Sequence, residues 1–542
     1  MSKPQSISFH HPWAVWFGCM AIVAGVLAHM PMFWMGRYNG FRMVGMPMDM
    51  TMLVGMALIP VGLALATFGL MPRLEQMRAQ RIGAHVVQFH VADGVPLNRE
   101  HWKLVIVLVV ALAVDVLKPA SLGFVMPGMT EEYAITKETA GLLALIALTG
   151  TTVGSIVWGR IADTFGRRAA ILLSALMFIG TAICGAMPSF GWNLAMCFLM
   201  GASAGGLLPI TFTLMAEMIP ARHRGWLLVA LGGVGTSAGY LLAAGAAAML
   251  EPLFSWRALW LLGLPTGLMI VFLDKFIPES PRFLANAGLH GEAQAVLSRY
   301  SGVLDKDEPA DPETAVEAEA KKPSSWDLLR GSHARVTRGL MVCGIAWGLA
   351  NFGFLLWLPT NLRAMGMDAG TATALLARSA ILAMPGIALV IWLYHRWSSI
   401  KALVLFIALT SASLLAFFVM GLMQMQSQAA MLMATVGLLV SSSGVIAMLI
   451  PYAAEIYPVH LRGTGSGAIA ACSKFGGILG ALFGVLGLFG NLTLSALFIA
   501  LPMAISAVML LRSGIDTRGR RLEDIQLDLQ ARNSRVNAGD GA

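Results

Sequence analysis

Residues 216–225 read AEMIPARHRG, and residues 454–463 read AEIYPVHLRG. The pattern AExxPxxxRG therefore occurs twice, at an offset of 238 residues. Each copy lies where a long apolar run ends. A unit repeated in parallel within a membrane chain is typical of transporters built from two similar halves, with the substrate site between them. The repeat favours transport over catalysis or scaffolding.

The composition is that of a membrane protein. Of 542 residues, 57% are hydrophobic and only 12% are charged. Several apolar runs exceed the roughly 20 residues that a helix needs to cross a bilayer. The net charge of +8 does not indicate nucleic-acid binding, because the basic residues gather in short loops between apolar runs, as the positive-inside rule expects. The five cysteines fall in apolar segments without metal-ligand or disulfide spacing.

The apolar runs are arranged as two, then six, then six, which predicts an all-α polytopic protein of 14 transmembrane helices in the lipid bilayer. Its parts are an accessory transmembrane hairpin and linker (1–103), an N-terminal six-helix bundle (104–277), a cytoplasmic linker with short helices (278–337), a C-terminal six-helix bundle (338–512) and a cytoplasmic tail (513–542). The even number of spans and the basic loops predict cytoplasmic termini and an inner-membrane location.

Two further motifs accompany the repeat. Residues 159–168, GRIADTFGRR, resemble the GxxxDxxGRR loop of the major facilitator superfamily, and residues 278–284, PESPRFL, resemble the PESPRxL motif of its sugar porters and organic-ion transporters. The core from about 104 to 512 thus resembles that superfamily, nearest its sugar porters, organic-ion transporters and aromatic-acid:proton symporters. The resemblance implies two six-helix bundles that move a small solute by alternating access. The first two spans lie outside it.

Charged residues at the loop motifs are the candidates for gating. A carboxylate between helix ends, beside arginines, can form ion pairs that hold one half closed and release when the cavity reopens. In the second half, residues 395–399 (HRWSS) stand where a second Asp-containing loop is expected. We therefore predict that the ion pairs that act as a latch, holding one half closed, are stronger in the first half. The predicted gating residues are Asp163, Arg167, Arg168, Glu217, Arg222, Arg224, Glu455 and Arg462.

Charges within apolar spans are costly, so each is a candidate for function. Asp115 and Lys118 lie three residues apart and hence on one helix face. Pro119 follows and loosens the helix there. Asp115 is the carboxylate best placed to carry a coupling proton, and Lys118 adds positive charge for a substrate. Alternatively, the two residues form an internal pair that only stabilises the helix.

Two cations and an aromatic stripe are predicted in the second half. The resemblance implies an anion-binding arginine at the position of Lys474, where a lysine keeps the charge but loses the bidentate fork. Arg378 is the second cation. Trp347 and Asn351 share one helical face and are candidates for substrate contact, although such a stripe can equally serve packing.

The hairpin is rich in methionine at its outer end. Thioethers at this spacing suit soft Cu(I), whereas flexible apolar side chains also suit helix contacts. The metal-binding alternative rests on Met43, Met46, Met48, Met50 and Met52.

We therefore predict a secondary active transporter of a small organic anion, coupled to protons. The alternatives are a carrier of copper or another soft metal, and a transport-inactive membrane receptor or scaffold. No nucleophile–base set, catalytic metal spacing or phosphate loop is apparent, so we expect neither an enzyme nor a cofactor.

Overall fold

The computed structural model describes residues 11–70, 95–301, 328–329 and 333–517, apart from 288, 426, 458, 489 and 490. Within this part, 14 helices are long and apolar enough to cross a membrane, which confirms the predicted number and the all-α class. Parts of the predicted polar segments lie outside the described residues, namely 73–94, 302–327 and 518–542.

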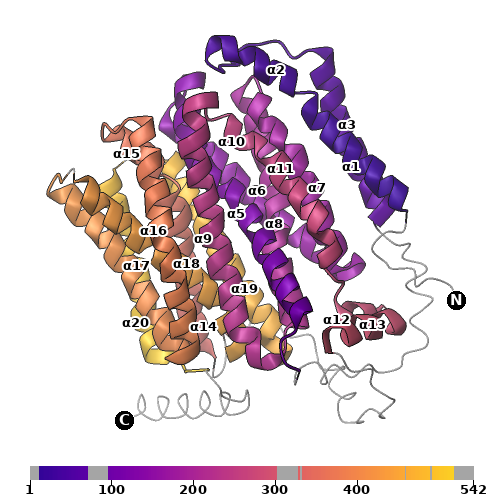
Figure 1. Ribbon diagram of the computed structural model, residues 1–542. Helices are drawn as coiled ribbons and strands as arrows, with labels where there is room; N and C mark the ends of the chain where they lie inside the picture. The colour runs from indigo at the N-terminus through magenta and orange to yellow at the C-terminus, as the bar shows by residue number, and fades with distance from the viewer. Residues whose placement is uncertain are drawn as a thin grey trace. The chain divides into compact units, whose positions relative to one another are not determined.

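The N-terminal hairpin is a tightly packed helix pair. It consists of α1 (Pro12–Leu27), α2 (Met30–Met35), the 3₁₀ helix η1 (Gly36–Asn39) and α3 (Met50–Leu70). Glycines face each other along it: a Cβ on Gly18 or on Gly25 would lie 2.6 Å from the carbonyl oxygen of Gly62 or of Gly55, respectively. Small residues let membrane helices approach this closely. Figure 1 shows α1 and α3 side by side, next to α7 (Arg167–Gly180), which both contact.

The described helices sort into two compact units. Unit 1 holds residues 1–224 and 245–312, and unit 2 holds residues 225–244 and 313–542. Besides the hairpin, the first group of helices comprises α5 (Arg99–Tyr133), α6 (Lys137–Phe165), α7, η3 (Thr181–Ala186), α8 (Phe190–Met218), α9 (Ala221–Phe254), α10 (Ala258–Leu261), α11 (Gly263–Leu273), η4 (Asp274–Phe276), α12 (Pro281–Asn286) and α13 (His290–Ser301). Residues 225–244 of α9 group with unit 2.

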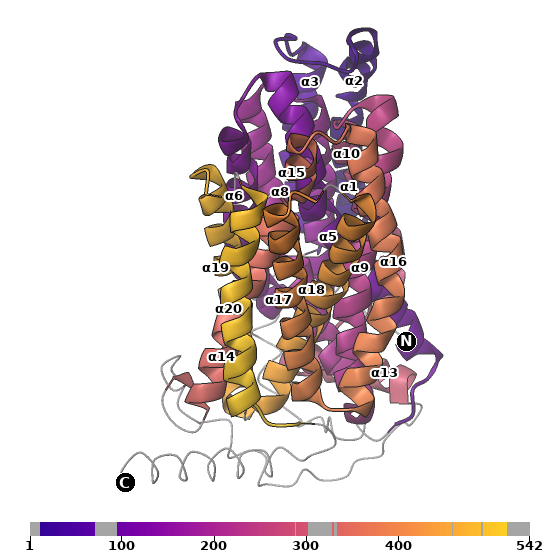
Figure 2. The same cartoon turned by 90° about the vertical axis from the view of Figure 1, so that its left-hand side faces the viewer.

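Unit 2 contains six membrane-crossing segments after the linker, as predicted. Its helices are α14 (Ala334–Gly348), the π-helix η8 (Leu349–Leu355), α15 (Leu358–Ala364), α16 (Ala369–Arg396), α17 (Ser399–Leu422), α18 (Gln428–Ile456), α19 (Val459–Val485) and α20 (Leu492–Ser513). Figure 2 shows α14, α17 and α20 along one side of this unit, where α20 packs against both of the others.

Local sequence explains where most helices begin. The side chains of Asn98, Thr136 and Ser189 accept hydrogen bonds from the first backbone N–H groups of α5, α6 and α8. Helix α5 continues through Pro119 and Pro127, so the predicted loosening does not end it. Helix α7 is different, because its N-cap Gly166 has no side chain to accept such a bond. Its capping group comes from a distant part of the chain.

Candidate functional site

Lys118 lies inside unit 1. Its side chain is 1% exposed, and its amine donates to the carbonyl oxygen of Phe178 at 2.9 Å and to Thr181 Oγ1 at 2.5 Å. The amine also lies 4.2 Å from the centre of the Phe178 ring. These contacts are made where α7 ends and η3 begins, and a cation is favourable at the carbonyl end of a helix. The described contacts of Lys118 therefore join α5 to α7.

Asp115 is one turn before Lys118 on α5 and is also buried. A buried carboxylate at this depth of an apolar helix is costly unless it has a function or a compensating partner. Pro119 follows four residues later and cannot donate to the backbone carbonyl of Asp115, so this turn of α5 lacks one helical hydrogen bond. The segment combines a carboxylate, an ammonium group and a weakened helix turn within five residues.

The candidates in unit 2 gather where α14 and its π-helix meet α19. A Cβ on Gly348 would lie 2.2 Å from the carbonyl oxygen of Ser473, the residue before Lys474, so the two helices are in backbone contact. Asn351 lies within η8. π-Helical turns are rare and are frequent at functional sites. Lys474 is partly exposed on α19, beside this irregular turn.

Aromatic rings surround the same junction. Trp347 donates through Nε1 to the carbonyl oxygen of Ser442 on α18 at 2.9 Å, which orients its indole. Phe352 of η8 stands edge-on to Trp347, with ring centres 6.2 Å apart, and a Cβ on Gly477 of α19 would lie 2.8 Å from the Phe352 ring. Arg378, by contrast, has an exposed side chain on α16.

The predicted gating residues of the first half form a charged network at the end of unit 1 where the GRR loop lies, which we call the basic end. Arg167 Nη2 lies 3.3 Å from Glu217 Oε1 and 3.5 Å from Asp163 Oδ1. Glu217 is nearly buried, whereas the Asp163 side chain is 78% exposed. Arg168 Nε donates to Asp274 Oδ1 at 2.7 Å and its guanidinium also pairs with Oδ2. The loop is thus fixed mainly through Glu217 and Asp274.

Glu279, from the PESPRFL motif, caps the start of α7. Its Oε1 accepts the N–H of Arg167 at 2.7 Å, and its Oε2 accepts the N–H of Arg168 at 3.2 Å. Gly166 has φ 106° and ψ 158°, and a Cβ there would lie 2.3 Å from Glu279 Oε2. Burial raises the pKa of Glu279 to about 7, against the lowering effect of these N–H donors and of Arg167. Only glycine fits between the loop and its cap.

Other predicted gating residues lie elsewhere. Arg224 donates through Nε and Nη2 to the carbonyl oxygen of Ile219, 3.3 and 3.2 Å away, at the end of α8. Arg222 is exposed. The side chain of Arg462 lies outside the described residues.

In unit 2, two hydroxyl groups contact the second glutamate of the repeat. Tyr394 and Thr517 donate to Glu455 Oε2 at 2.8 and 2.6 Å. Asp516 Oδ1 accepts the backbone N–H and the hydroxyl of Ser399, both at 2.9 Å, at the start of α17. Tyr452 donates to the carbonyl oxygen of Ile515 at 2.8 Å. The segment after α20 therefore folds back onto α17 and α18.

The methionines around the loop between α2 and α3 are partly buried where the hairpin contacts the rest of unit 1. Met43 and Met52 are buried in one hydrophobic cluster with Met32, Phe33 and Ala258. Met46 and Met48 pack against this cluster, whereas Met50 is exposed. The contacts of Met43 and Met52 support a packing role for these side chains.

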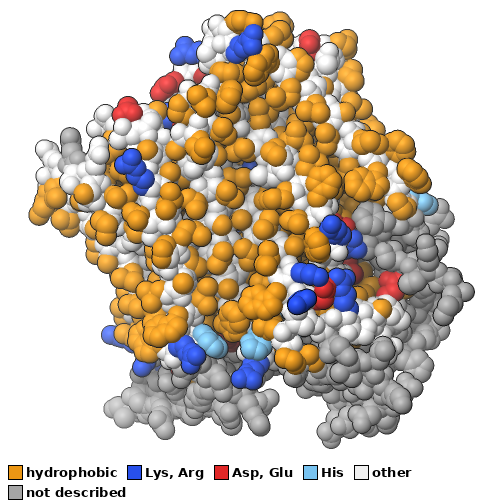
Figure 3. Space-filling model, viewed as in Figure 1, with side chains coloured by type: hydrophobic (Ala, Val, Ile, Leu, Met, Phe, Trp, Pro, Cys, Tyr) orange, Lys and Arg blue, Asp and Glu red, His pale blue; other side chains and the backbone are white. Residues whose placement is uncertain are grey.

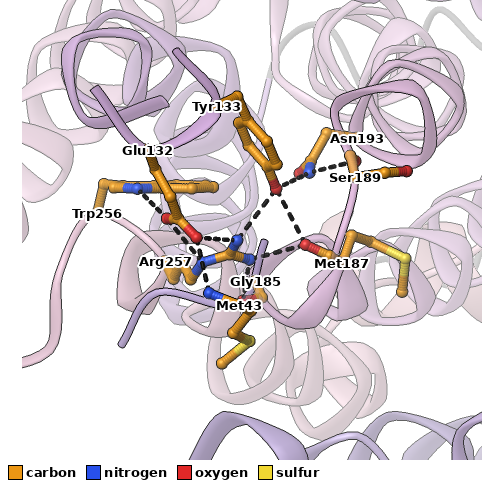
Figure 4. Close-up of polar contacts among 9 residues, drawn as sticks. All are labelled: Met43, Glu132, Tyr133, Gly185, Met187, Ser189, Asn193, Trp256 and Arg257. Atoms are coloured by element: carbon orange, nitrogen blue, oxygen red, sulfur yellow. Dashed lines mark hydrogen bonds and ion pairs between the residues drawn. The ribbon is translucent and has the colours of Figure 1, made fainter. Parts of the chain in front are cut away.

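A buried ion pair holds this loop of the hairpin (Figure 4). Arg257, which is fully buried, donates to Glu132 through Nη2 at 2.6 Å and through Nε at 3.1 Å. It also donates to the carbonyl oxygens of Gly185 and Met187. The same carboxylate accepts the backbone N–H of Met43 at 2.8 Å. The Glu132 carboxylate thus connects the loop of the accessory hairpin to Arg257 in the rest of unit 1.

Sequence reasoning missed Asp274, Arg257 and Asp516, and it quoted Glu279 without a role. One signal was available for Asp516, because it follows Glu279 by 237 residues, nearly the offset of the repeat. Arg257 and Asp274 lie at the edges of apolar runs, where a single charge does not reveal its partner.

Comparisons with known proteins match the core of the chain. The family model of the Major Facilitator Superfamily matches residues 104–481. The niacin transporter NiaP of Acinetobacter baylyi is 28% identical, over 80% of this chain and 98% of its own length. The 4-hydroxybenzoate transporter PcaK of the same organism is 28% identical, over 77% and 92%. The xylose transporter XylE from E. coli, in a partially occluded inward-open conformation, has a similar fold: TM-score 0.63, 15% identity, covering 78% of this chain and 100% of XylE.

Proposed function

Since the chain belongs to the Major Facilitator Superfamily and is a multi-pass membrane transporter of small solutes, we propose that its substrate is a small aromatic carboxylate, carried together with a proton by alternating access. The bilayer that it spans is the inner membrane, with both termini in the cytoplasm.

One observation carries the choice of substrate. Two relatives that align over nearly their whole length are named for niacin and 4-hydroxybenzoate, both of which are aromatic carboxylic acids. The charges of this chain agree with such a solute, because Lys474 and Arg378 are cations within apolar spans of unit 2. An ammonium group offers a carboxylate a charge-assisted hydrogen bond, which is about twice as strong as a neutral one.

The junction of α14, η8 and α19 supports a contact surface for this solute. Lys474 binds the carboxylate, while Trp347 and Phe352 offer ring edges and faces to an aromatic ring. Asn351 supplies an amide for a ring hydroxyl or ring nitrogen. The π-helix supports a change of shape here, because its wide turn can tighten without unfolding the rest of the segment.

Asp115 is the proposed carrier of the coupling proton. It is buried, and Pro119 has weakened the helix around it. Lys118 is a positioning residue in this scheme, because its amine already donates to Phe178 and Thr181 and is 1% exposed. By bridging α5 to α7, it holds the turn that carries Asp115.

The networks at the basic end act as latches in the proposed cycle. Arg167, at the start of α7, connects the last turn of α6 with the end of α8, through Asp163 and Glu217. Breaking these pairs frees the loop to move when unit 1 changes its orientation. The glutamate of the second copy, Glu455, serves the same purpose through hydroxyl partners.

The test is uptake into proteoliposomes with an imposed pH gradient, using labelled 4-hydroxybenzoate, nicotinate and the neutral nicotinamide. We expect saturable, gradient-driven uptake of the acids alone. Lys474→Ala should reduce uptake at least tenfold, Lys474→Arg should retain much of it, and Lys401→Ala, a change of an exposed lysine elsewhere in unit 2, should leave it unchanged. Equal uptake of nicotinamide, or full activity of Lys474→Ala, would refute the proposal.

A further inference from the structure

A pocket of about 330 Å³ lies between the accessory hairpin and the core of unit 1. Trp16 of α1 and Leu70 of α3 form one wall, and Leu172 of α7 and Phe272 of α11 form the other. Its volume is at the lower end of the range typical of small-molecule sites, roughly 300–1,000 Å³. Without the hairpin, one side of this pocket would not exist.

The pocket is apolar along the helices and charged at one end. Arg168, Asp274 and Lys275 line that end. Arg168 and Asp274 neutralise each other through their hydrogen-bonded ion pair. Lys275 has an exposed side chain, with its amine 4.9 Å from the centre of the Phe276 ring. The end of the pocket therefore carries one net positive charge.

The surroundings indicate that the pocket opens at the level of the membrane surface. The charged end belongs to the basic end of unit 1, where Arg168 is the second residue of α7 and Lys275 follows α11. Trp13 and Trp16, at the same end of α1, are exposed, as is usual for the aromatic residues that anchor helices at the membrane interface. Over the hairpin and unit 1, on the right of Figure 3, hydrophobic side chains cover the middle of the helices and charged ones gather towards the ends.

We propose that this pocket binds one anionic phospholipid. An acyl chain lies between the hairpin and the α7–α11 wall, and the phosphate lies against the amine of Lys275, beside the Arg168 guanidinium. A net charge of +1 favours a lipid of net charge −1 over a zwitterionic one, whose own cation would meet Lys275. A free anion such as phosphate fits less well than a lipid, because it has no apolar chain to fill the space between the apolar walls.

The site has a consequence for the loop after α6. Arg168 lines the pocket with its side chain, while its backbone N–H is held by Glu279. A phosphate beside Lys275 and Arg168 therefore adds a partner to a residue in the first turn of α7. The accessory hairpin thus links the composition of the bilayer to the charged network of unit 1, whatever solute the protein carries.

The experiment is native mass spectrometry of the full chain, delipidated in detergent and titrated with phosphatidylglycerol or phosphatidylcholine of identical acyl chains. We expect one tightly retained phosphatidylglycerol, bound about fivefold more tightly than phosphatidylcholine, as one surface cation supplies. Lys275→Ala should remove that preference. Val271→Trp, which fills the pocket from α11, should weaken the binding of both lipids.

Lys401→Ala is the matched control, because it removes an exposed lysine at the start of α17 in unit 2. Its affinity for phosphatidylglycerol should equal that of wild type. Equal affinity for the two lipids in wild type, or an equal loss in Lys275→Ala and Lys401→Ala, would overturn the proposal. Displacement of the lipid by millimolar glycerol phosphate would also overturn it, since the acyl chain would then contribute nothing.

Discussion

The loops at the ends of the two units hold corresponding helices by different chemistry. In unit 1, Glu279 accepts from the first two backbone N–H groups of α7, and Arg167 and Arg168 pair with carboxylates around it. In unit 2, Asp516 accepts from the first N–H of α17. There the nearby glutamate of the repeat accepts from a tyrosine and a threonine hydroxyl.

A comparison of the two loops shows which feature the two copies of the duplicated unit share. Both copies keep a carboxylate at a helix start, supplied by the segment that follows the last span of that half. Among the contacts that the structure describes, the partners are guanidinium groups in unit 1 and hydroxyl groups in unit 2. An ionic network depends on charge and is screened by salt, whereas neutral hydroxyl donors hold a carboxylate without adding charge. We expect the stability of the first loop to depend on the charge of its residues and on salt. We expect the stability of the second loop to depend on its single hydrogen bonds.

The largest effect should come from Gly166→Ala. The backbone conformation of Gly166 is one that only glycine adopts readily, and the added Cβ would collide with Glu279 Oε2. Strain of this kind costs about 1–3 kcal/mol, and displacement of the cap adds about 1 kcal/mol. Thermal unfolding in detergent should show a loss of about 3 kcal/mol.

The corresponding position in unit 2 provides the control. Ser398, the N-cap of α17, has φ −166° and accepts from the N–H of Lys401. Ser398→Ala should lose only the cap, about 1 kcal/mol. Equal losses in the two variants would contradict the idea that the first loop is the more tightly constrained.

The second prediction compares the two carboxylates directly. Glu279→Ala leaves the N–H groups of Arg167 and Arg168 without their acceptor, which should cost about 2 kcal/mol. Asp516→Ala should cost about 1 kcal/mol, because the Ser399 hydroxyl still accepts from the backbone N–H of Thr517. Both are measured by thermal unfolding in one detergent. A larger loss for Asp516→Ala would reverse the comparison.

The fold was predictable because it depends on local properties. Apolar length alone located the 14 spans, and the capping residues mark where α5, α6 and α8 begin. The π-helix was not predictable; it directly follows the place where α14 packs on α19 at Gly348 and Ser473. A wide turn of this kind leaves no separate signal in hydropathy.

The sequence indicated which charged residues are candidates for the site, but not which residues they contact. The sequence predicted that Lys118 shares a helix face with Asp115, and it did not indicate that the described hydrogen bonds of Lys118 reach Phe178 on α7 and Thr181 on η3. Which helix lies opposite a buried charge is a property of tertiary packing. Likewise, the spacing of the methionines is compatible with metal binding, and only the structure shows Met43 inside a hydrophobic cluster.

The third prediction concerns pH. The pKa of Glu279 is raised from 4.5 to about 7, so the folded state favours its protonated form. The part of its contribution to stability that depends on protonation is complete below pH 4.5 and is lost as the pH rises through 7. The unfolding temperature of wild type, relative to Glu279→Gln in the same buffers, should therefore fall between pH 5 and pH 8. A constant difference would show that Glu279 does not titrate in this range.

The smallest effect should be the response to salt. The Asp163 side chain is 78% exposed and lies 3.5 Å from Arg167. Asp163→Asn should therefore lower the free energy of unfolding by a few tenths of a kcal/mol at low salt. At about 1 M salt the loss should be almost zero, because the ions screen charges over about 3 Å. Tyr394→Phe removes one hydrogen bond to Glu455 and should cost about 1 kcal/mol at either salt concentration. If the cost of Tyr394→Phe also fell with salt, the second network would depend on charge as much as the first, and the chemical distinction between the two loops would fail.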